Sequence, residues 1–249
     1  MKALDALEGR HFGKPVSEDL VERYWAIPQI VPRDPILRIL DAGAGDGYII
    51  SKLKAKGHDV TAMEAAAINI KHLKRRGIPV VPHDMTRSPY PIKDESFDMV
   101  ICADVLEHLY RPDVCLKELH RILRHDGALL LSTPNYSHPY RILQLIRGDS
   151  FHDPFEEYQF WAHVRYFTHK TLTKFIESFG FFVADVFLPL PAVVTQYARF
   201  TKGSKLREFF ALHLYPKIFY RISPRFCDEP ILVCRKKKSK TKVRLLSKT

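Results

Sequence analysis

The sequence is poor in cysteine and has no long apolar run, and each shortage excludes a class of protein. Its 249 residues include four cysteines, Cys102, Cys115, Cys227 and Cys234, and no pair has a metal-ligand spacing such as C-x-x-C. We therefore expect reduced thiols in a cytosolic protein, with a Cys227–Cys234 disulfide as the alternative. No apolar stretch reaches the ~18 residues of a transmembrane helix, and the charged segment MKALDALEGRHFGKP is unlike a signal peptide. We predict a cytoplasmic protein.

Acidic residues are missing from the C-terminal end of the chain. The last fifteen residues, RKKKSKTKVRLLSKT, hold eight lysines and arginines, so of the net charge of +11 only +3 belongs to the rest. Runs of like charge are usually solvated, and we expect a basic, disordered tail over 236–249. The same tail could bind anionic lipid or nucleic acid.

Short apolar segments alternate with helix-like segments from residue 36 onward. The strand-like segments are ILRILDAG, HDVTAME, IPVV, SFDMVICAD and GALLLSTPN; the helix-like ones are YIISKLKAKG, AAAINIKHLKRRG and RPDVCLKELHRILRHDG, and each of these three ends in glycine. We expect the third helix to run to Gly127. Such alternation indicates βαβ units, hence an α/β fold with a parallel sheet covered by helices on both faces. Sheets of this kind bind ligands at the carboxyl ends of their strands.

The glycine-rich segment ILDAGAGDGY (39–48) follows the first strand and contains no lysine. Gly43, Gly45 and Gly47 lack a Cβ, so the turn can be tight and a ligand can approach the backbone. A P-loop needs Gly-Lys-Ser/Thr at the helix start, where this chain has Gly-Tyr-Ile. A dinucleotide turn is spaced G-x-G-x-x-G rather than G-x-G-x-G, and Asp41 would repel its pyrophosphate by about 4 kcal/mol at ~4 Å and an effective dielectric of ~20.

Asp41 suits a ligand that carries positive charge and no phosphate, as S-adenosylmethionine does with its ammonium and sulfonium groups. Acids also end the next two strands. Glu64 lies twenty-three residues after Asp41, a distance typical of an acid that binds ribose hydroxyls. Asp84 could accept from the adenine amino group, with Met85 against the ring. Three acids at successive strand ends favour this cofactor over merely solvated or capping side chains.

Six motifs follow one another along the chain: ILDAGAGDGY, VTAME, HDM, FDMVICADVLEHL, GALLLSTPN and HVRYFTHKTLTKFIESFGF. As a set they resemble class I S-adenosylmethionine-dependent methyltransferases, in particular the branch of ubiquinone-biosynthesis and small-molecule O-methyltransferases. The resemblance covers about residues 36–190 and a last strand near 230–235. It implies a Rossmann-like, doubly wound, seven-stranded sheet, mostly parallel with the last strand antiparallel, within one methyltransferase domain over 1–235. The cofactor contacts it implies are Asp41, Gly43, Gly45, Glu64, Asp84, Met85, Ala103 and Asp104.

A catalytic base is expected where the fourth strand ends, in ADVLEHL (103–109). An oxygen nucleophile benefits from a base with a pKa near neutral pH, and histidine is the usual one. Asp104 and Glu107 have capping-box spacing, which would explain both acids without catalysis. Some quinone O-methyltransferases of the resembled branch hold a divalent ion in an acidic-x-x-Glu-His cluster, but theirs begins with Glu, so we assign no metal. His108 is the first candidate base, and it could also orient the substrate.

Aromatic residues are concentrated after the fifth strand. Residues 151–167 include seven aromatics and two histidines, and the resembled enzymes place a substrate lid here. We expect 136–167 to be this lid insertion, with packing onto a helix at 169–179 as the alternative. His163 is the second candidate base, although a histidine among aromatics can be structural. The predicted acceptor is a hydroxyl of a small or lipid- or sugar-linked metabolite.

A second insertion is expected at 191–229, where the resembled fold has a short hairpin. Its segment 205–222 mixes Lys and Arg with Phe, Leu, Ile and Tyr, and we expect Pro216 to break it. It could be a cap over the pocket, a dimer surface or an interfacial amphipathic segment. With the basic tail it predicts peripheral membrane contact and a lipid-linked substrate.

Two other functions stay open. The basic tail suggests an RNA methyltransferase, although base-amino methylation typically needs an Asn/Asp-Pro-Pro-aromatic stretch where this chain has ADVLEH. A non-catalytic cofactor-binding protein would keep the same acids without turnover.

Overall fold

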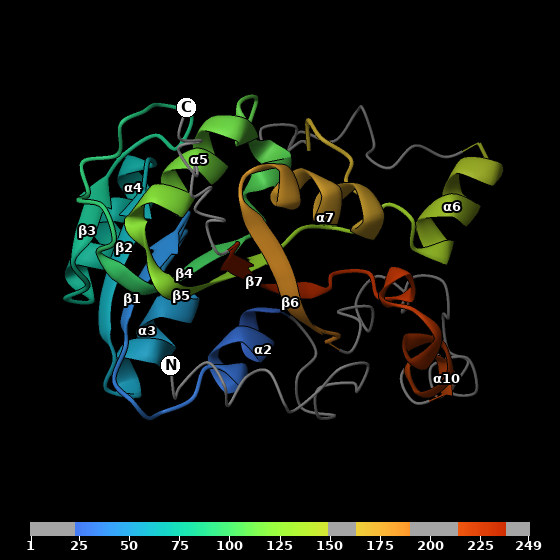
Figure 1. Cartoon of the computed structure of the whole chain (residues 1–249), viewed down its shortest axis with the longest axis horizontal. Helices are drawn as coiled ribbons and strands as arrows, with labels where there is room; N and C mark the ends of the chain where they lie inside the picture. The colour runs from blue at the N-terminus through green and yellow to red at the C-terminus, as the bar shows by residue number, and fades with distance from the viewer. Residues whose placement is uncertain (1–22, 149–162, 190–213, 238–249) are drawn as a thin grey trace, which may run out of the picture.

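The structure is a computed structural model that describes residues 23–148, 163–189 and 214–237 (Figure 1). Four parts of the chain lie outside these residues: 1–22, 149–162, 190–213 and 238–249. Much of the expected lid, most of the expected insertion and nearly all of the expected tail therefore fall outside the description.

Seven strands form one sheet in the order β3-β2-β1-β4-β5-β7-β6. Neighbouring strands from β3 to β5 pair in parallel, whereas β7 is antiparallel to both β5 and β6. This confirms the expected Rossmann-like sheet with its last strand antiparallel. The strands are β1 (Arg38–Ala42), β2 (Asp59–Glu64), β3 (Val80–Pro82), β4 (Phe97–Ala103), β5 (Leu123–Ser132), β6 (Phe181–Phe187) and β7 (Ile231–Lys236).

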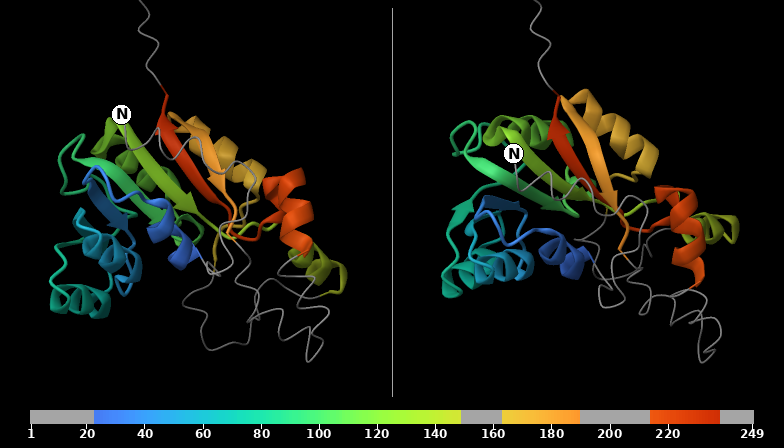
Figure 2. Two further views of the ribbon diagram at one scale, coloured as in Figure 1. Left: turned by 90° about the horizontal axis from the view of Figure 1, so that it is seen from below. Right: turned by 60° about the horizontal axis from the view of Figure 1, so that its bottom comes forward.

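Helices cover both faces of the sheet, as Figure 2 shows. Buried residues of α2, α3 and α4 pack on one face, and those of α5 and α7 pack on the other. The helices are α2 (Arg23–Ile30), α3 (Tyr48–Ala55), α4 (Ala67–Arg75), α5 (Pro112–Ile122), α6 (Pro139–Ile146), α7 (His169–Ser178) and α10 (Tyr215–Ile222), with short 3₁₀ turns η1 (Leu106–His108) and η4 (Pro224–Phe226).

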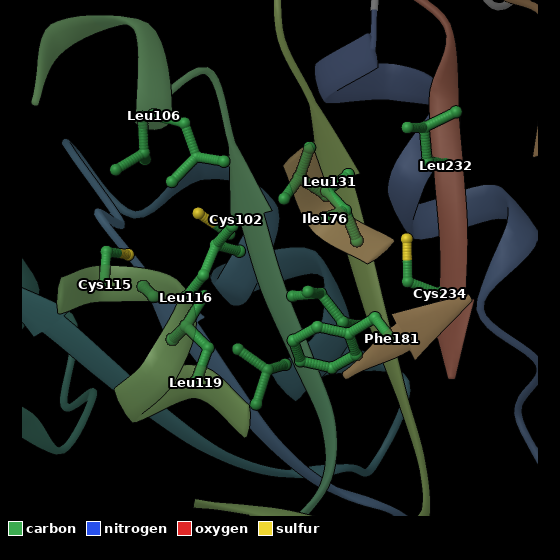
Figure 3. Packing of buried hydrophobic residues seen from close by; sticks show 14 of the residues in the cluster. Cys102, Leu106, Cys115, Leu116, Leu119, Leu131, Ile176, Phe181, Leu232 and Cys234 are labelled. Carbon is green, nitrogen blue, oxygen red and sulfur yellow. The ribbon is translucent and has the colours of Figure 1, made fainter. Parts of the chain in front are cut away.

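Strand β4 shows why its sequence is apolar throughout. Val100 and Cys102 belong to the hydrophobic cluster under α5 and α7, which Figure 3 shows, whereas Met99 and Ile101 belong to the cluster under α3. Successive side chains of a strand point to opposite faces, so a strand buried on both faces needs apolar residues at every position. All four cysteines are buried and free, so the alternative of a Cys227–Cys234 disulfide is wrong.

One expected boundary is wrong. Helix α5 ends at Ile122, because Leu123 already pairs with Phe97 of β4 and begins β5, and this long-range pairing overrides the helical pattern that continues to Gly127. Pro216 lies in the first turn of α10, and most of the expected segment before this helix falls outside the described residues, so its interruption by Pro216 stays a prediction. In the first turn of a helix the missing N–H of proline has no intrahelical partner to lose.

Candidate functional site

The expected cofactor residues lie along one edge of the sheet. Asp41 is near the end of β1, Glu64 ends β2, Asp84 and Met85 follow β3, and Ala103 ends β4. These four strands are neighbours and run in parallel, so their carboxyl ends meet at this edge. The acids that the sequence places far apart are thus on one side of the molecule.

The glycine turn after β1 is held close to β2 and β4. The N–H of Gly43 donates to the Met63 carbonyl at 2.9 Å, and the N–H of Gly45 donates to Glu64 Oε2 at 2.8 Å. Gly43 has φ +83°, and a Cβ there would lie 2.5 Å from Val105 Cγ2 and 3.1 Å from Met85 Cε. Beside Gly45 a Cβ would meet nothing within 4 Å, so the turn is packed on one side and open at its tip.

Asp41 is a buried carboxylate whose charge is poorly compensated. Its side chain is 3% exposed, and Asp41 Oδ2 accepts no hydrogen bond from the residues that the structure describes. Burial, and then the negative charge of Glu64, raise the pKa of Asp41 to about 7. A cationic group bound beside this carboxylate would stabilise the ionised form, so the site fits a ligand with a positive charge.

Glu64 and Asp84 are fixed by local hydrogen bonds. Glu64 Oε1 accepts from the N–H groups of Ala65 and Ala66, both at 2.8 Å. Asp84 Oδ1 accepts from the N–H and hydroxyl of Thr86 at 2.9 and 2.7 Å, and these bonds hold the pKa of Asp84 below its usual value. A carboxylate has about four acceptor positions, so both can still receive hydroxyl or amino donors.

The capping-box interpretation of Asp104 and Glu107 is wrong. Asp104 has φ +52°, and its Oδ1 accepts from the Ser132 hydroxyl at 3.0 Å, which ties it to β5 instead of a helix start. The following turn η1 has no side-chain cap. Glu107 is fully buried, and its carbonyl accepts from the N–H groups of Val164 and Arg165.

Both candidate histidines lie in one polar cluster beside η1. The rings of His108 and His163 are 4.6 Å apart in edge-to-face geometry, and Tyr136 Oη is 2.6 Å from His163 Nδ1. One potential ligand atom from each of Glu107, His108 and His163 lies within 4.8 Å of the other two. This spacing could accommodate one cation, with His163 rather than Asp104 as the third group. The sequence spacing groups Asp104 with Glu107 and His108, whereas in the structure Asp104 bonds to Ser132.

The two ends of the expected lid, Tyr136 and Phe167, are in contact with each other. The N–H of Tyr136 donates to the carbonyl of Phe167 at 2.8 Å, and Phe167 packs on Phe175 of α7 at 5.7 Å between ring centroids. The alternative expectation of packing onto this helix is therefore realised at Phe167. Helix α7 itself begins with a reciprocal cap between Thr168 and Thr171.

A half-buried ion pair lies next to the Tyr136 ring. Arg141 Nε donates to Asp228 Oδ1 at 2.9 Å, and the Arg141 guanidinium lies 4.7 Å from the centre of the Tyr136 ring. Burial raises the pKa of the Tyr136 hydroxyl, which stays protonated at neutral pH. Sequence analysis missed Arg141 and Asp228, because 87 positions separate them and no local pattern links them.

The family model of the methyltransferase domain matches residues 10–186, which is more than half of the chain. The chain belongs to this methyltransferase family. Its sheet order and the glycine turn at the carboxyl edge agree with that assignment.

Known relatives support the same family. A probable S-adenosylmethionine-dependent methyltransferase of Mycobacterium tuberculosis is 29% identical over 46% of this chain and 44% of its own length. A ubiquinone biosynthesis O-methyltransferase of Rickettsia conorii is 32% identical over 44% of this chain and 39% of its own. The chain thus spans about half the length of the curated relatives it matches. A solved S-adenosylmethionine-dependent methyltransferase of Archaeoglobus fulgidus shares the fold, with a TM-score of 0.58 and 21% identity over 89% of this chain and 95% of that one.

Proposed function

We propose that this methyltransferase transfers a methyl group from S-adenosylmethionine to a hydroxyl of a small or lipid- or sugar-linked metabolite. The observation that carries the proposal is the buried, uncompensated carboxylate of Asp41 beside an open glycine turn, at the same sheet edge as the paired histidines. S-adenosylmethionine, when bound, supplies a methyl group that its sulfonium activates.

The cofactor is held by the residues at the ends of β1 to β4. Asp41 accepts from the ammonium group, and Glu64 accepts from the ribose hydroxyls while Gly45 keeps the carboxylate in place. Asp84 and Met85 form the adenine side of the site, and Ala103 and the backbone of Asp104 close its inner end. Positioning of this kind can supply roughly 7–11 kcal/mol of a bimolecular barrier.

His163 is the proposed base. In the tautomer that serves this role, His163 Nδ1–H donates to the Tyr136 hydroxyl oxygen, and Nε2 is the atom that takes the proton of the acceptor hydroxyl. Tyr136 keeps its own proton and orients the ring. His108 packs edge-on against His163 and limits its rotation from the other side.

Steady-state release of S-adenosylhomocysteine over a panel of phenolic, lipid-linked and sugar hydroxyl acceptors tests the proposal. We expect His163→Gln to lower kcat by about 10²–10⁴ without weakening cofactor binding, because general-base catalysis contributes about that much. His125→Gln, an exposed histidine in the strand β5, is the matched control. Turnover by His163→Gln within about twofold of the parent would contradict the base assignment.

Chelation with EDTA distinguishes a histidine base from a metal ion bound by the same residues. If Glu107, His108 and His163 hold a metal ion, EDTA abolishes turnover; the proposed base predicts unchanged turnover in EDTA. Absence of any S-adenosylmethionine-dependent turnover over the panel, with binding intact by calorimetry, would favour the non-catalytic cofactor-binding protein instead.

A second candidate is an RNA acceptor, because exposed cations gather on α3 and α4. Hollows on this surface are lined by Lys54 and Arg76, and by Lys71, Lys74 and Arg75. RNA binding whose logarithm falls steeply with the logarithm of salt concentration, and which Lys71→Glu/Lys74→Glu reduces, would favour it.

A further inference from the structure

Exposed aliphatic side chains are concentrated on two short helices at one end of the molecule. Of the thirteen exposed large hydrophobic residues in the described ranges, seven belong to α6 or to α10 with its N-cap residue: Ile142, Leu143, Leu145, Ile146, Leu214, Ile218 and Ile222. Both helices lie at the same end in Figure 1 and in both views of Figure 2. We call these residues the α6–α10 face.

Two contacts connect each helix with a residue next to the other. The Tyr215 hydroxyl of α10 lies 3.4 Å from Nε2 of His138, the residue before α6. Arg141 of α6 forms its ion pair with Asp228, which follows η4. The α6–α10 face is therefore held together by groups beneath it and does not depend on contacts among the exposed side chains.

Helix α10 has its own inner and outer sides. Tyr220 is 1% exposed and belongs to the main hydrophobic cluster, and Tyr215 packs against that cluster, so the aromatic residues provide the packing against the domain. Leu214, Ile218 and Ile222 recur every fourth residue and form an apolar stripe on the surface, with Ile222 65% exposed.

Basic residues flank this stripe at the same spacing. Lys217 and Arg221 lie four residues apart on α10, and neither forms an ion pair within the part of the chain that the structure describes; Arg225 lies beyond the helix, in η4. Arg147 immediately follows α6, and neither α6 nor α10 contains an acidic residue. An apolar stripe beside exposed cations is complementary to a surface that has negatively charged groups on the outside and hydrocarbon beneath them.

We propose that the α6–α10 face docks onto an anionic lipid bilayer, with its isoleucines and leucines in the boundary between headgroups and acyl chains. Amphipathic helices with this division lie in the plane of the interface, and cations near an anionic surface each add about 1 kcal/mol. No helix among the described residues is long and apolar enough to span a membrane. The charge pattern favours lipid over a neutral protein partner.

Docking here would bring the bilayer next to the acceptor cluster. Helix α6 begins three residues after Tyr136, and its Arg141 stacks on the Tyr136 ring. A lipid-linked hydroxyl could then reach His163 without leaving the membrane. The docking itself does not depend on the proposed chemistry, because it involves none of the cofactor or base residues.

Co-sedimentation of the full chain with vesicles tests the docking. Binding is measured on vesicles of phosphatidylcholine mixed with phosphatidylglycerol, and on phosphatidylcholine alone. We expect Ile218→Ser/Ile222→Ser to weaken binding to the mixed vesicles by at least about tenfold, since each isoleucine loses apolar contact worth ~1 kcal/mol or more. Lys217→Glu/Arg221→Glu should weaken it at least about fivefold and reduce its dependence on phosphatidylglycerol.

Matched controls exclude non-specific effects. Ile68→Ser and Lys71→Glu/Lys74→Glu make the same changes on α4, where Ile68 is 63% exposed, and should leave vesicle binding unchanged. Thermal melting and calorimetric cofactor binding show whether each variant is folded. Full vesicle binding by the α10 variants, or equal loss with the α4 variants, would overturn the proposal; so would a stable complex of two chains that the α10 variants dissociate. Vesicle binding without methyl transfer would refute the proposed function alone.

Discussion

Asp41 should lower the stability of the ligand-free protein while making cofactor binding possible. Its pKa in the folded chain is raised from 3.8 to about 7. Between these values the unfolded chain is ionised and the folded chain is protonated, so the folded state binds more protons and stability falls as pH rises through this window. The shift of about three units corresponds to about 4 kcal/mol by pH 7.5, of which about half remains at pH 5.5.

Replacing Asp41 with asparagine removes this cost. The amide keeps the shape but buries polar groups of its own, which takes back about 1–3 kcal/mol. We therefore expect Asp41→Asn to raise the free energy of unfolding by about 1–3 kcal/mol at about pH 7.5, and this advantage should shrink by about 2 kcal/mol at about pH 5.5. Urea denaturation followed by circular dichroism at both pH values measures it.

The same substitution should abolish cofactor binding. In the parent chain, calorimetric affinity for S-adenosylmethionine should fall about twentyfold from about pH 7.5 to about pH 5.5, because binding must then ionise Asp41. Asp98→Asn is the control: burial would raise the pKa of Asp98, but hydrogen bonds and ion pairs with Arg38 and Arg124 hold it below its usual value. That control should lower stability and leave affinity unchanged. A gain from Asp41→Asn that is the same at both pH values, or affinity that does not change with pH, would refute the reasoning.

Two further substitutions test the packing around the site. Gly43→Ala should cost at least about 1–3 kcal/mol of stability and weaken cofactor binding, since φ is +83° and the new Cβ would meet Val105. Thermal melting measures the loss of stability, and calorimetry measures the loss of affinity. Full cofactor affinity in Gly43→Ala would contradict this prediction. Asp228→Asn should cost about 1–3 kcal/mol in urea denaturation by leaving the partly buried Arg141 guanidinium without its charged partner, and Arg141→Met/Asp228→Asn should recover part of the loss. A double variant no more stable than Asp228→Asn would refute the pairing argument.

The alternation of apolar and helical segments was sufficient to predict the sheet. Parallel strands buried on both faces are apolar at every position, and β4 follows this rule from Met99 to Cys102. Strand ends could also be predicted, so Asp41, Glu64 and Asp84 were expected at one edge, where they lie. The end of α5 could not be predicted, because Leu123 is drawn into β5 by Phe97, a partner that local propensity does not reveal.

The sequence by itself determined the architecture of this methyltransferase and the gathering of three acids at one sheet edge, because both follow from local periodicity and from residues next to strand ends. Only the tertiary structure decided the histidine cluster. It turned Asp104 away to Ser132, brought His163 against His108 and Tyr136, and placed Asp228 behind Tyr136 through Arg141. These contacts join residues that are up to 87 positions apart, and they form because buried polar groups must find partners wherever the packed chain supplies them.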